Sequence, residues 1–352
     1  MIRPALLVAL LLMPAWLLAQ AGDASTIGLV TIVEGEVTVL REAREFRAVE
    51  GVPLRAEDIV RSRETALLTR IELQDGTLLD LGPATELLLQ PQGLASTPAA
   101  PGASLYLLRG WLKVTAASGK TSTGIALASP QIALASLSGN VIVRVAPRAS
   151  LAFVEAGQAN AFERSPGKPV AAYTLNDGDS VVVRSGTSAA VVRRPPLDLI
   201  DGLPRAFTDT LPRRVAQWRG RTVAEPAPLG EPGYADLAPW LHADPALRAA
   251  FVKRFSPLLR DRGFRSSLVA ELPAHPEWGR VLFPEKYRAR TASTVATVAA
   301  RRPATPPLPA HRPPTAPRTA NGMLAPPPPP AAIDRPTTDA AIAQAPRTET
   351  NP

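Results

Sequence analysis

The chain of 352 residues contains no cysteine. An exported protein without cysteine has no disulfide bonds, so its stability must come from buried apolar surface. The same absence excludes a thiol nucleophile, a lipid anchor built on cysteine and any metal site that uses thiolates. Only three histidines are present, His242, His275 and His311. They provide no clustered histidine site, and we expect no metal and no cofactor.

Aromatic residues are also scarce, at 5% of the chain, whereas 39 Lys and Arg outnumber 31 Asp and Glu. The arginines are scattered and no aromatic platform accompanies them, so we expect no nucleic-acid partner. In an exported protein, the formal charge of +8 favours anionic partners such as an acidic envelope protein, an anionic envelope polymer or lipid head groups.

Long apolar runs are missing except at the start, where one extends from Ala5 to Leu18. It is shorter than the roughly 20 residues that a membrane-spanning helix needs. It follows Arg3 and precedes Ala19-Gln20-Ala21, the order typical of a secretory signal peptide. We therefore predict that residues 1–21 are removed after Ala21, and that the mature protein is periplasmic and without a transmembrane segment.

Residues 26–192 consist of short alternating runs, such as Val141 to Val145, separated by turn clusters such as Asn176-Asp177-Gly178-Asp179. This pattern predicts a mainly β domain, an antiparallel sandwich or roll. Residues 193–204, which contain Arg193-Arg194-Pro195-Pro196, are expected to form a linker. Residues 205–288 are expected to form a small α-helical module, and the Pro/Ala/Arg-rich residues 289–352 a disordered tail that folding does not require.

Within the module, several helices are expected to start at a residue that precedes proline. Asp244-Pro245 fits the start of a helix that carries Leu247, Phe251 and Phe255 on one face. Ser256-Pro257 and His275-Pro276 are expected to start shorter helices. A further helix is predicted over residues 208–220.

One hairpin in the β region, IELQDGTLLDLGPATELLL at residues 71–89, has two possible registers. A loop formed by Gln74, Asp75 and Gly76 pairs Leu73 with Thr77 and Ile71 with Leu79. It leaves Glu72 and Asp80 in water and uses Gly76 as a left-handed residue, so we favour it over a two-residue turn. The candidate turn residues across the β region are Asp75, Gly76, Gly110, Gly139 and Gly178.

No catalytic set emerges from these residues. The nucleophile pattern G-x-S-x-G is absent, and Ser118-Gly119-Lys120-Thr121 lacks the preceding glycine of a phosphate-binding loop. Pairs such as Asp75/Asp80 or Asp177/Asp179 could act on sugars as acid and base, but aspartates beside glycine are more typical of turns. A basic patch of Arg213, Arg214, Arg219 and Arg221 is a candidate surface for an anionic partner.

The β region resembles the FecR family, through degenerate motifs that follow one another in the order of that family. The motifs are Gly35-Glu36-Val37-Thr38-Val39, Gly51-Val52-Pro53-Leu54, Glu57 to Ser62, Leu73-Gln74-Asp75-Gly76-Thr77, Leu108 to Val114, Ala128-Ser129-Pro130 through Val143, and Phe153-Val154-Glu155-Ala156-Gly157. Asn140 and Ala156 depart from the pattern. The familiar members carry a cytoplasmic anti-sigma segment where this chain has only its signal peptide. The resemblance therefore implies a secreted, stand-alone FecR-like protein.

The resemblance implies a domain that binds or senses in the periplasm, and it supplies no catalytic residues. The leading hypothesis is a non-enzymatic binding or sensing protein that offers a strand edge or a groove to an envelope protein or polymer. An envelope polysaccharide or peptidoglycan hydrolase and a cell-wall attachment protein are the alternatives. The hydrolase requires that two of Asp75, Asp80, Glu86, Asp177 and Asp179 meet in one cleft.

Overall fold

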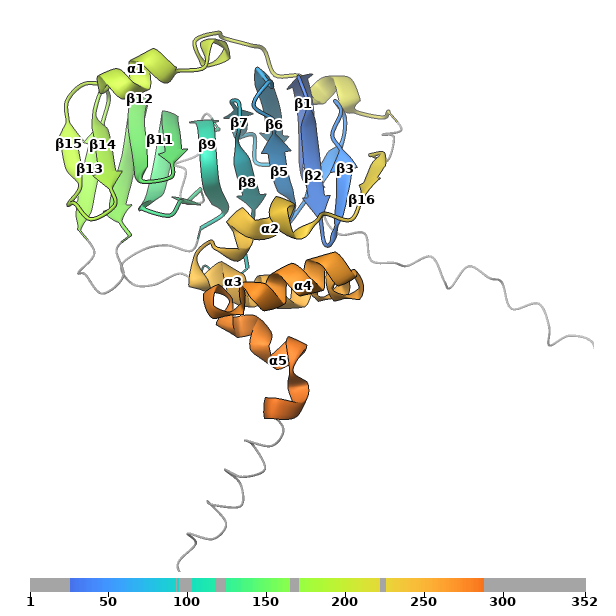
Figure 1. Cartoon of the computed structure of the whole chain (residues 1–352). Coiled ribbons are helices and arrows are strands. Elements are labelled where there is room, and N and C mark those ends of the chain that lie inside the picture. Colours follow the sequence, from blue (N-terminus) through green and yellow to red (C-terminus); the bar gives the residue numbers. More distant parts are fainter. Residues whose placement is uncertain are drawn as a thin grey trace, which may run out of the picture. The chain divides into compact units, whose positions relative to one another are not determined.

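The protein is mainly β, with a helical module near the end of the described region (Figure 1). The computed structural model describes residues 26–92, 94, 103–117, 125–164, 171–221 and 226–287. The predicted signal peptide, the predicted tail with His311, and Ser118 to Thr121 lie outside these residues. The fold class expected from the sequence is confirmed for the part that is described.

The described strands form one sheet. They are β1 (Thr26–Glu34), β2 (Val37–Arg41), β3 (Arg44–Arg47), β4 (Pro53–Arg55), β5 (Ile59–Ser62), β6 (Leu68–Leu73), β7 (Leu78–Leu81), β8 (Glu86–Leu89), β9 (Leu105–Thr115), β10 (Leu127–Ala128), β11 (Ile132–Ala146), β12 (Ala149–Glu163), β13 (Ala172–Asn176), β14 (Ser180–Arg184), β15 (Ala190–Val192) and β16 (Pro228–Gly230). Their pairings are antiparallel, except that β10 runs parallel to β9. The sheet is therefore mixed rather than wholly antiparallel.

Three long strands, β9, β11 and β12, change partners halfway along their length. The first half of β9 pairs with β8 and its second half with β7. Likewise β12 pairs with β14 from Ala149 to Phe153 and with β13 from Gln158 to Phe162. The sheet consequently folds over itself into two layers. The first layer contains β4, β1, β6, β7, β14 and β15, and the second contains β16, β3, β2, β5, β8, β10 and β13.

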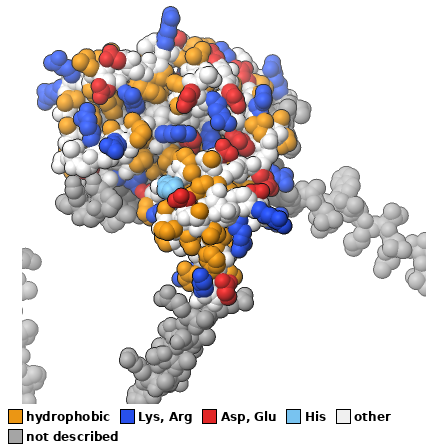
Figure 2. Space-filling view, viewed as in Figure 1, with side chains coloured by type: hydrophobic (Ala, Val, Ile, Leu, Met, Phe, Trp, Pro, Cys, Tyr) orange, Lys and Arg blue, Asp and Glu red, His pale blue; other side chains and the backbone are white. Residues whose placement is uncertain are grey.

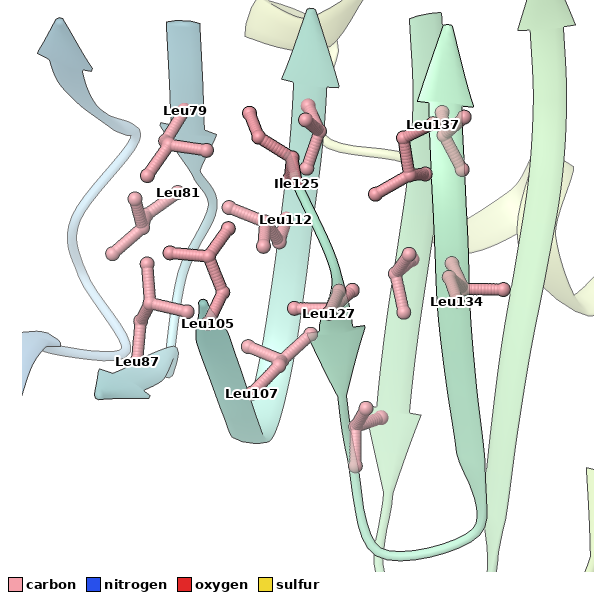
Figure 3. Packing of buried hydrophobic residues seen from close by; sticks show 14 of the residues in the cluster. Leu79, Leu81, Leu87, Leu105, Leu107, Leu112, Ile125, Leu127, Leu134 and Leu137 are labelled. Atoms are coloured by element: carbon pink, nitrogen blue, oxygen red, sulfur yellow. The ribbon is translucent and has the colours of Figure 1, made fainter. Parts of the chain in front are cut away.

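The main core lies between these layers and is built from aliphatic side chains (Figure 3). Leucines of β7, β8, β9, β10 and β11 meet there, because alternate residues of each strand point inward. Leu79, Leu105, Leu112 and Leu134 are each at most 2% exposed. Burial of this aliphatic surface holds the domain together without disulfides.

Gly110 and Gly139 lie inside β9 and β11 rather than in turns, which corrects the expectation for both. Their φ angles are +96° and +67°, in the region that favours glycine. A Cβ on Gly110 would lie 2.4 Å from Cα of Thr85, and one on Gly139 would lie 2.1 Å from the carbonyl oxygen of Ala156. Both glycines therefore permit close contact between backbones where the long strands pass from one layer to the other. Gly76 and Gly178 do lie in turns, with φ of +88° and +80°.

The helical elements follow the strands. They are α1 (Leu197–Gly202), η2 (Arg205–Phe207), η3 (Val215–Trp218), α2 (Tyr234–Leu241), α3 (Pro245–Phe255), η4 (Ser256–Arg260), α4 (Arg262–Ala270), η5 (Leu272–Ala274), η6 (Pro276–Trp278) and α5 (Gly279–Leu282), where η denotes a 3-10 helix. Asp244 caps α3 by accepting a hydrogen bond from the backbone N–H of Ala246, and Pro245 occupies the first turn, as the sequence predicts. The helix expected over residues 208–220 does not form; only η3 is helical there.

The helices from α2 to α5 cover the outer face of the second layer. Their aromatic side chains Trp240, Phe251 and Phe255 share one buried cluster with Ile59 of β5 and Tyr106 of β9. Arg254 of α3 fastens this contact by donating hydrogen bonds to the carbonyl oxygens of Leu40, Glu42 and Glu57, at 2.6–3.0 Å. Burial lowers the pKa of Arg254 to about 10. The described strands and helices form one compact unit.

Residues 197–218 cover the outer face of the first layer, and we call this segment the strap. Leu199 and Phe207 are 2% and 1% exposed and pack against Trp111, Ile142 and other outer side chains of the first layer. Residues 197–202, in the predicted linker, thus form α1 and pack on the sheet. The boundary between the predicted domains stays a prediction.

Candidate functional site

The hairpin at residues 71–89 adopts the register favoured from the sequence. Ile71 lies opposite Leu79, and the backbone N–H of Leu73 donates to the carbonyl oxygen of Thr77 at 2.9 Å. The carboxylate of Asp75 accepts a hydrogen bond from the backbone N–H of Thr77 at 2.8 Å. Asp75 is therefore a turn residue, as the sequence indicates.

Asp80, in contrast, is not solvated, and that expectation is wrong. It is 3% exposed and forms a bidentate ion pair with Arg70, whose Nε and Nη2 lie 2.6 and 2.8 Å from the two carboxylate oxygens. This hydrogen-bonded partner raises the pKa of Arg70. Glu72 is 1% exposed, and its carboxylate accepts hydrogen bonds from the backbone N–H groups of Arg214 and Val215. The strap thus covers the face on which sequence alternation places these charges in water.

The other candidate carboxylates also make structural contacts. Asp177 accepts a hydrogen bond from the backbone N–H of Gly157, and Asp179 accepts one from Asn176. Glu86 pairs with Arg109 at 2.7 Å. Asp75 and Glu86 line two different clefts. Neither of these two clefts contains a second residue of the five, whereas a glycosidase needs two carboxylates in one cleft.

Within the described residues, no group of three or more Asp, Glu or His side chains could hold a metal ion. None of the helices described is both long and apolar enough to cross a membrane.

The four arginines of the predicted basic patch lie in and just after the strap. Arg213 donates a hydrogen bond to the carbonyl oxygen of Gly76, and Arg214 lies 3.6 Å from Glu50. Arg221 stacks over the ring of Trp218, 5.7 Å from its centroid, and Arg219 is exposed. Two of the four thus help to hold the strap on the sheet. Partner binding by the patch stays a prediction.

Two histidines form a cluster between α2 and η6. His275 is fully buried, its Nε2 lies 2.9 Å from the hydroxyl of Tyr234, and its ring centroid lies 4.5 Å from that of His242. Burial lowers the pKa of His275, and the nearby His242 lowers it further. Protonation of His275 is therefore disfavoured in the folded state.

Strand β15 is an exposed edge of the described sheet. It pairs with β14 on one side and ends the first layer on the other, and all three of its residues are exposed. Val191 and Val192 are 42% and 38% exposed, and Arg193 and Arg194 follow them in water. The edge strands β4 and β16 each contain a proline, which discourages strand addition, whereas β15 contains none. The exposed side chains of β13, a further edge, are Ala172, Thr174 and Asn176 rather than large apolar ones.

A second feature is a polar cleft of about 560 Å³ beside the start of α2. It is lined by Glu36, Arg61, Ser62, Arg63, Glu64, Thr65, Ala84, Glu86, Arg109, Ala235, Asp236 and Pro239. Figure 2 shows acidic and basic side chains intermixed on the face where the strands and helices meet. We call the cleft beside the start of α2 the polar cleft.

No family model matches the chain, and no curated protein matches it. Two solved structures, at 2.50 and 1.65 Å resolution, are similar to it and are described as a "putative anti-sigma factor" from Parabacteroides distasonis ATCC 8503. Each aligns at a TM-score of 0.30 and 13% identity, over 39% of this chain. The match spans 59% of that protein's chain, which is less than two thirds of its length. A likeness at this distance carries no argument about fold or function.

Neither the β15 edge nor the polar cleft was found from the sequence. A weak signal for the edge was available, because Ala190-Val191-Val192 lacks the polar alternation of a half-buried strand. The cleft has no local signal, since it joins residues of five separate segments.

Proposed function

We propose that this protein is a non-enzymatic, FecR-like binding or sensing protein of the bacterial envelope that acts in the periplasm. The signal-peptide pattern supports the periplasmic location, and the order of the FecR-like motifs supports the relation to the FecR family. The structural contacts made by the candidate carboxylates favour binding over hydrolysis.

The observation that carries the proposal is the open edge of β15. A strand edge offers unpaired backbone N–H and C=O groups to an extended segment of another protein, and neighbouring side chains select the segment. Val191 and Val192 offer apolar contact, and exposed Arg193 and Arg194 favour acidic residues. The partner we propose is an envelope protein with an extended segment that carries apolar and acidic residues.

Capture from a solubilised envelope extract tests this proposal. The immobilised protein is compared with a double variant, Val191→Glu with Val192→Glu, which places two acids on the edge. Leu229→Glu is the matched control, because Leu229 is 48% exposed on the proline-containing edge strand β16.

We expect the wild type and the Leu229→Glu control to retain the same envelope protein, and the double variant to lose about tenfold or more of it. The exposure of the substituted valines predicts an unchanged denaturation midpoint for all three proteins. Equal retention by the double variant, or retention of no protein by the wild type, would contradict the proposal.

A further inference from the structure

We propose that the polar cleft binds a small zwitterion, of the class of a short peptide with free amino and carboxyl ends. This inference concerns a second site and does not depend on capture of a protein at β15. It rests on three properties of the cleft: a fixed arginine, exposed charges of both signs, and a lining that is more polar than apolar.

Arg109 is the fixed arginine. One of its terminal nitrogens donates to Glu86 at 2.7 Å, while its side chain is 55% exposed. Glu86 is 6% exposed and also lies 3.7 Å from Nε of buried Arg61. Arg61 is held in turn by the carbonyl oxygen of Asp236 at 2.7 Å. A buried chain of charges therefore orients Arg109 and leaves other N–H groups of its guanidinium to face a ligand, an arrangement suited to a carboxylate.

The exposed charges of both signs decide the ligand class. Arg63 is 54% exposed, and Glu36, 3.7 Å from it, is 56% exposed. Glu64 is exposed beside them. A simple anion such as phosphate would meet these carboxylates, and a simple cation would meet Arg63 and Arg109. A zwitterion can place its carboxylate near the arginines and its ammonium near the glutamates.

The lining also argues against an apolar ligand. Its apolar members are two alanines and Pro239, and none of the described residues that line it is aromatic. A lipid chain or an aromatic ligand would gain little buried apolar area there. The cleft volume of about 560 Å³ lies within the range of roughly 300–1,000 Å³ found for small-molecule sites.

Titration calorimetry at low ionic strength tests the proposal with alanyl-alanine as the probe and the whole exported chain as the protein. N-acetyl-alanyl-alanine lacks the ammonium, and alanyl-alanine amide lacks the carboxylate. We expect one molar equivalent of alanyl-alanine to bind, and either capped form to bind about tenfold more weakly or worse.

The variants are Arg109→Gln and Glu64→Gln, with Arg148→Gln as the control because Arg148 is exposed outside the cleft. Each cleft variant should weaken binding about tenfold, and the control should bind like the wild type. Glu64 is exposed, so Glu64→Gln tests the cleft even if Arg109→Gln disturbs Glu86. The proposal is overturned if alanyl-alanine does not bind at millimolar concentration, if the capped peptides bind equally well, or if Glu64→Gln has no effect.

Discussion

At the scale of single residues, position 76 requires glycine because of its backbone conformation and not because neighbouring atoms crowd it. A Cβ there would meet Ala117 and Arg213 at 3.5 and 3.7 Å, which are ordinary contacts, but φ is +88°. Gly76→Val should therefore lower the free energy of unfolding by about 1–2 kcal/mol through strain. Asp75→Asn should change it little, because asparagine can also accept the bond from Thr77. Urea denaturation midpoints of the two variants check this order, and a larger loss for Asp75→Asn would contradict it.

The ion pair of Arg70 and Asp80 gives a second prediction at this scale. Asp80→Asn leaves the guanidinium of Arg70 buried without its charged partner, so the free energy of unfolding should fall by about 3–5 kcal/mol. Glu36→Gln breaks an exposed pair with Arg63 and should cost about 1 kcal/mol or less. Chemical denaturation of both variants compares the pairs. Equal losses would mean that the Arg70 pair is not shielded from water.

The sequence predicted the register of this hairpin but not the burial of its polar face. Alternation identifies which residues of a strand share a face, and it placed Ile71 opposite Leu79 correctly. It assigned Glu72 and Asp80 to water because they lie on the strand face opposite to Ile71 and Leu79. The cover comes from the strap, whose Leu211 accepts a hydrogen bond from Arg70 across 141 positions of sequence.

At the scale of elements, the strap packs on the outer face of the first layer. Phe207 is 1% exposed against the outer face of the first layer, so Phe207→Ala should lower the free energy of unfolding by about 3–5 kcal/mol. Leu197, 74% exposed on α1 of the same segment, is the matched control, and Leu197→Ala should change stability by about 0.5 kcal/mol or less. Thermal or urea unfolding measures both. If the strap did not pack on the sheet, Phe207→Ala would change stability as little as Leu197→Ala does, which would contradict the prediction.

The helical elements were predicted well where a local signal decides them. An aspartate before proline begins α3, and both residues act within one turn. The predicted helix over residues 208–220 does not form because groups distant in sequence bind its backbone N–H groups. Glu72 binds the N–H groups of Arg214 and Val215, and Pro212 lacks an N–H. Periodicity carries no information about such partners.

His275 makes the stability of the helical module depend on pH. Its pKa is lowered in the folded state, so its contribution is fully present above about pH 6.5, the ordinary value, and is lost as the pH falls and the unfolded chain takes up a proton first. The charged and titratable groups around it are His242, Tyr234, Glu277 and Arg248.

Urea midpoints between pH 8 and pH 5, followed by tryptophan fluorescence, test this dependence. The wild type should lose stability below about pH 6.5, and His275→Gln should show a flatter profile, whatever its stability at pH 8. Parallel profiles for the two proteins would show that other groups cause the loss.

At the scale of the whole molecule, the strap covers the outer face of the first layer, and the helices cover that of the second. Strand β15 remains as an apolar edge without proline. The class of fold followed from alternation and turn clusters along residues 26–192. The folding of one sheet into two layers did not, because it depends on where β9, β11 and β12 change partners. The polar cleft was missed for the same reason, since its charges meet only after the layers and α2 are assembled.

Amide hydrogen exchange tests the central claim, that a partner adds a strand at β15. The exchange of Ala190, Val191 and Val192 is measured with and without the envelope protein retained in the capture experiment. Strand addition places backbone groups of β15 in new hydrogen bonds, so we expect at least about tenfold slower exchange there and little change in β16 at the other layer's edge. Unchanged exchange in β15, with protection at another surface, would contradict it.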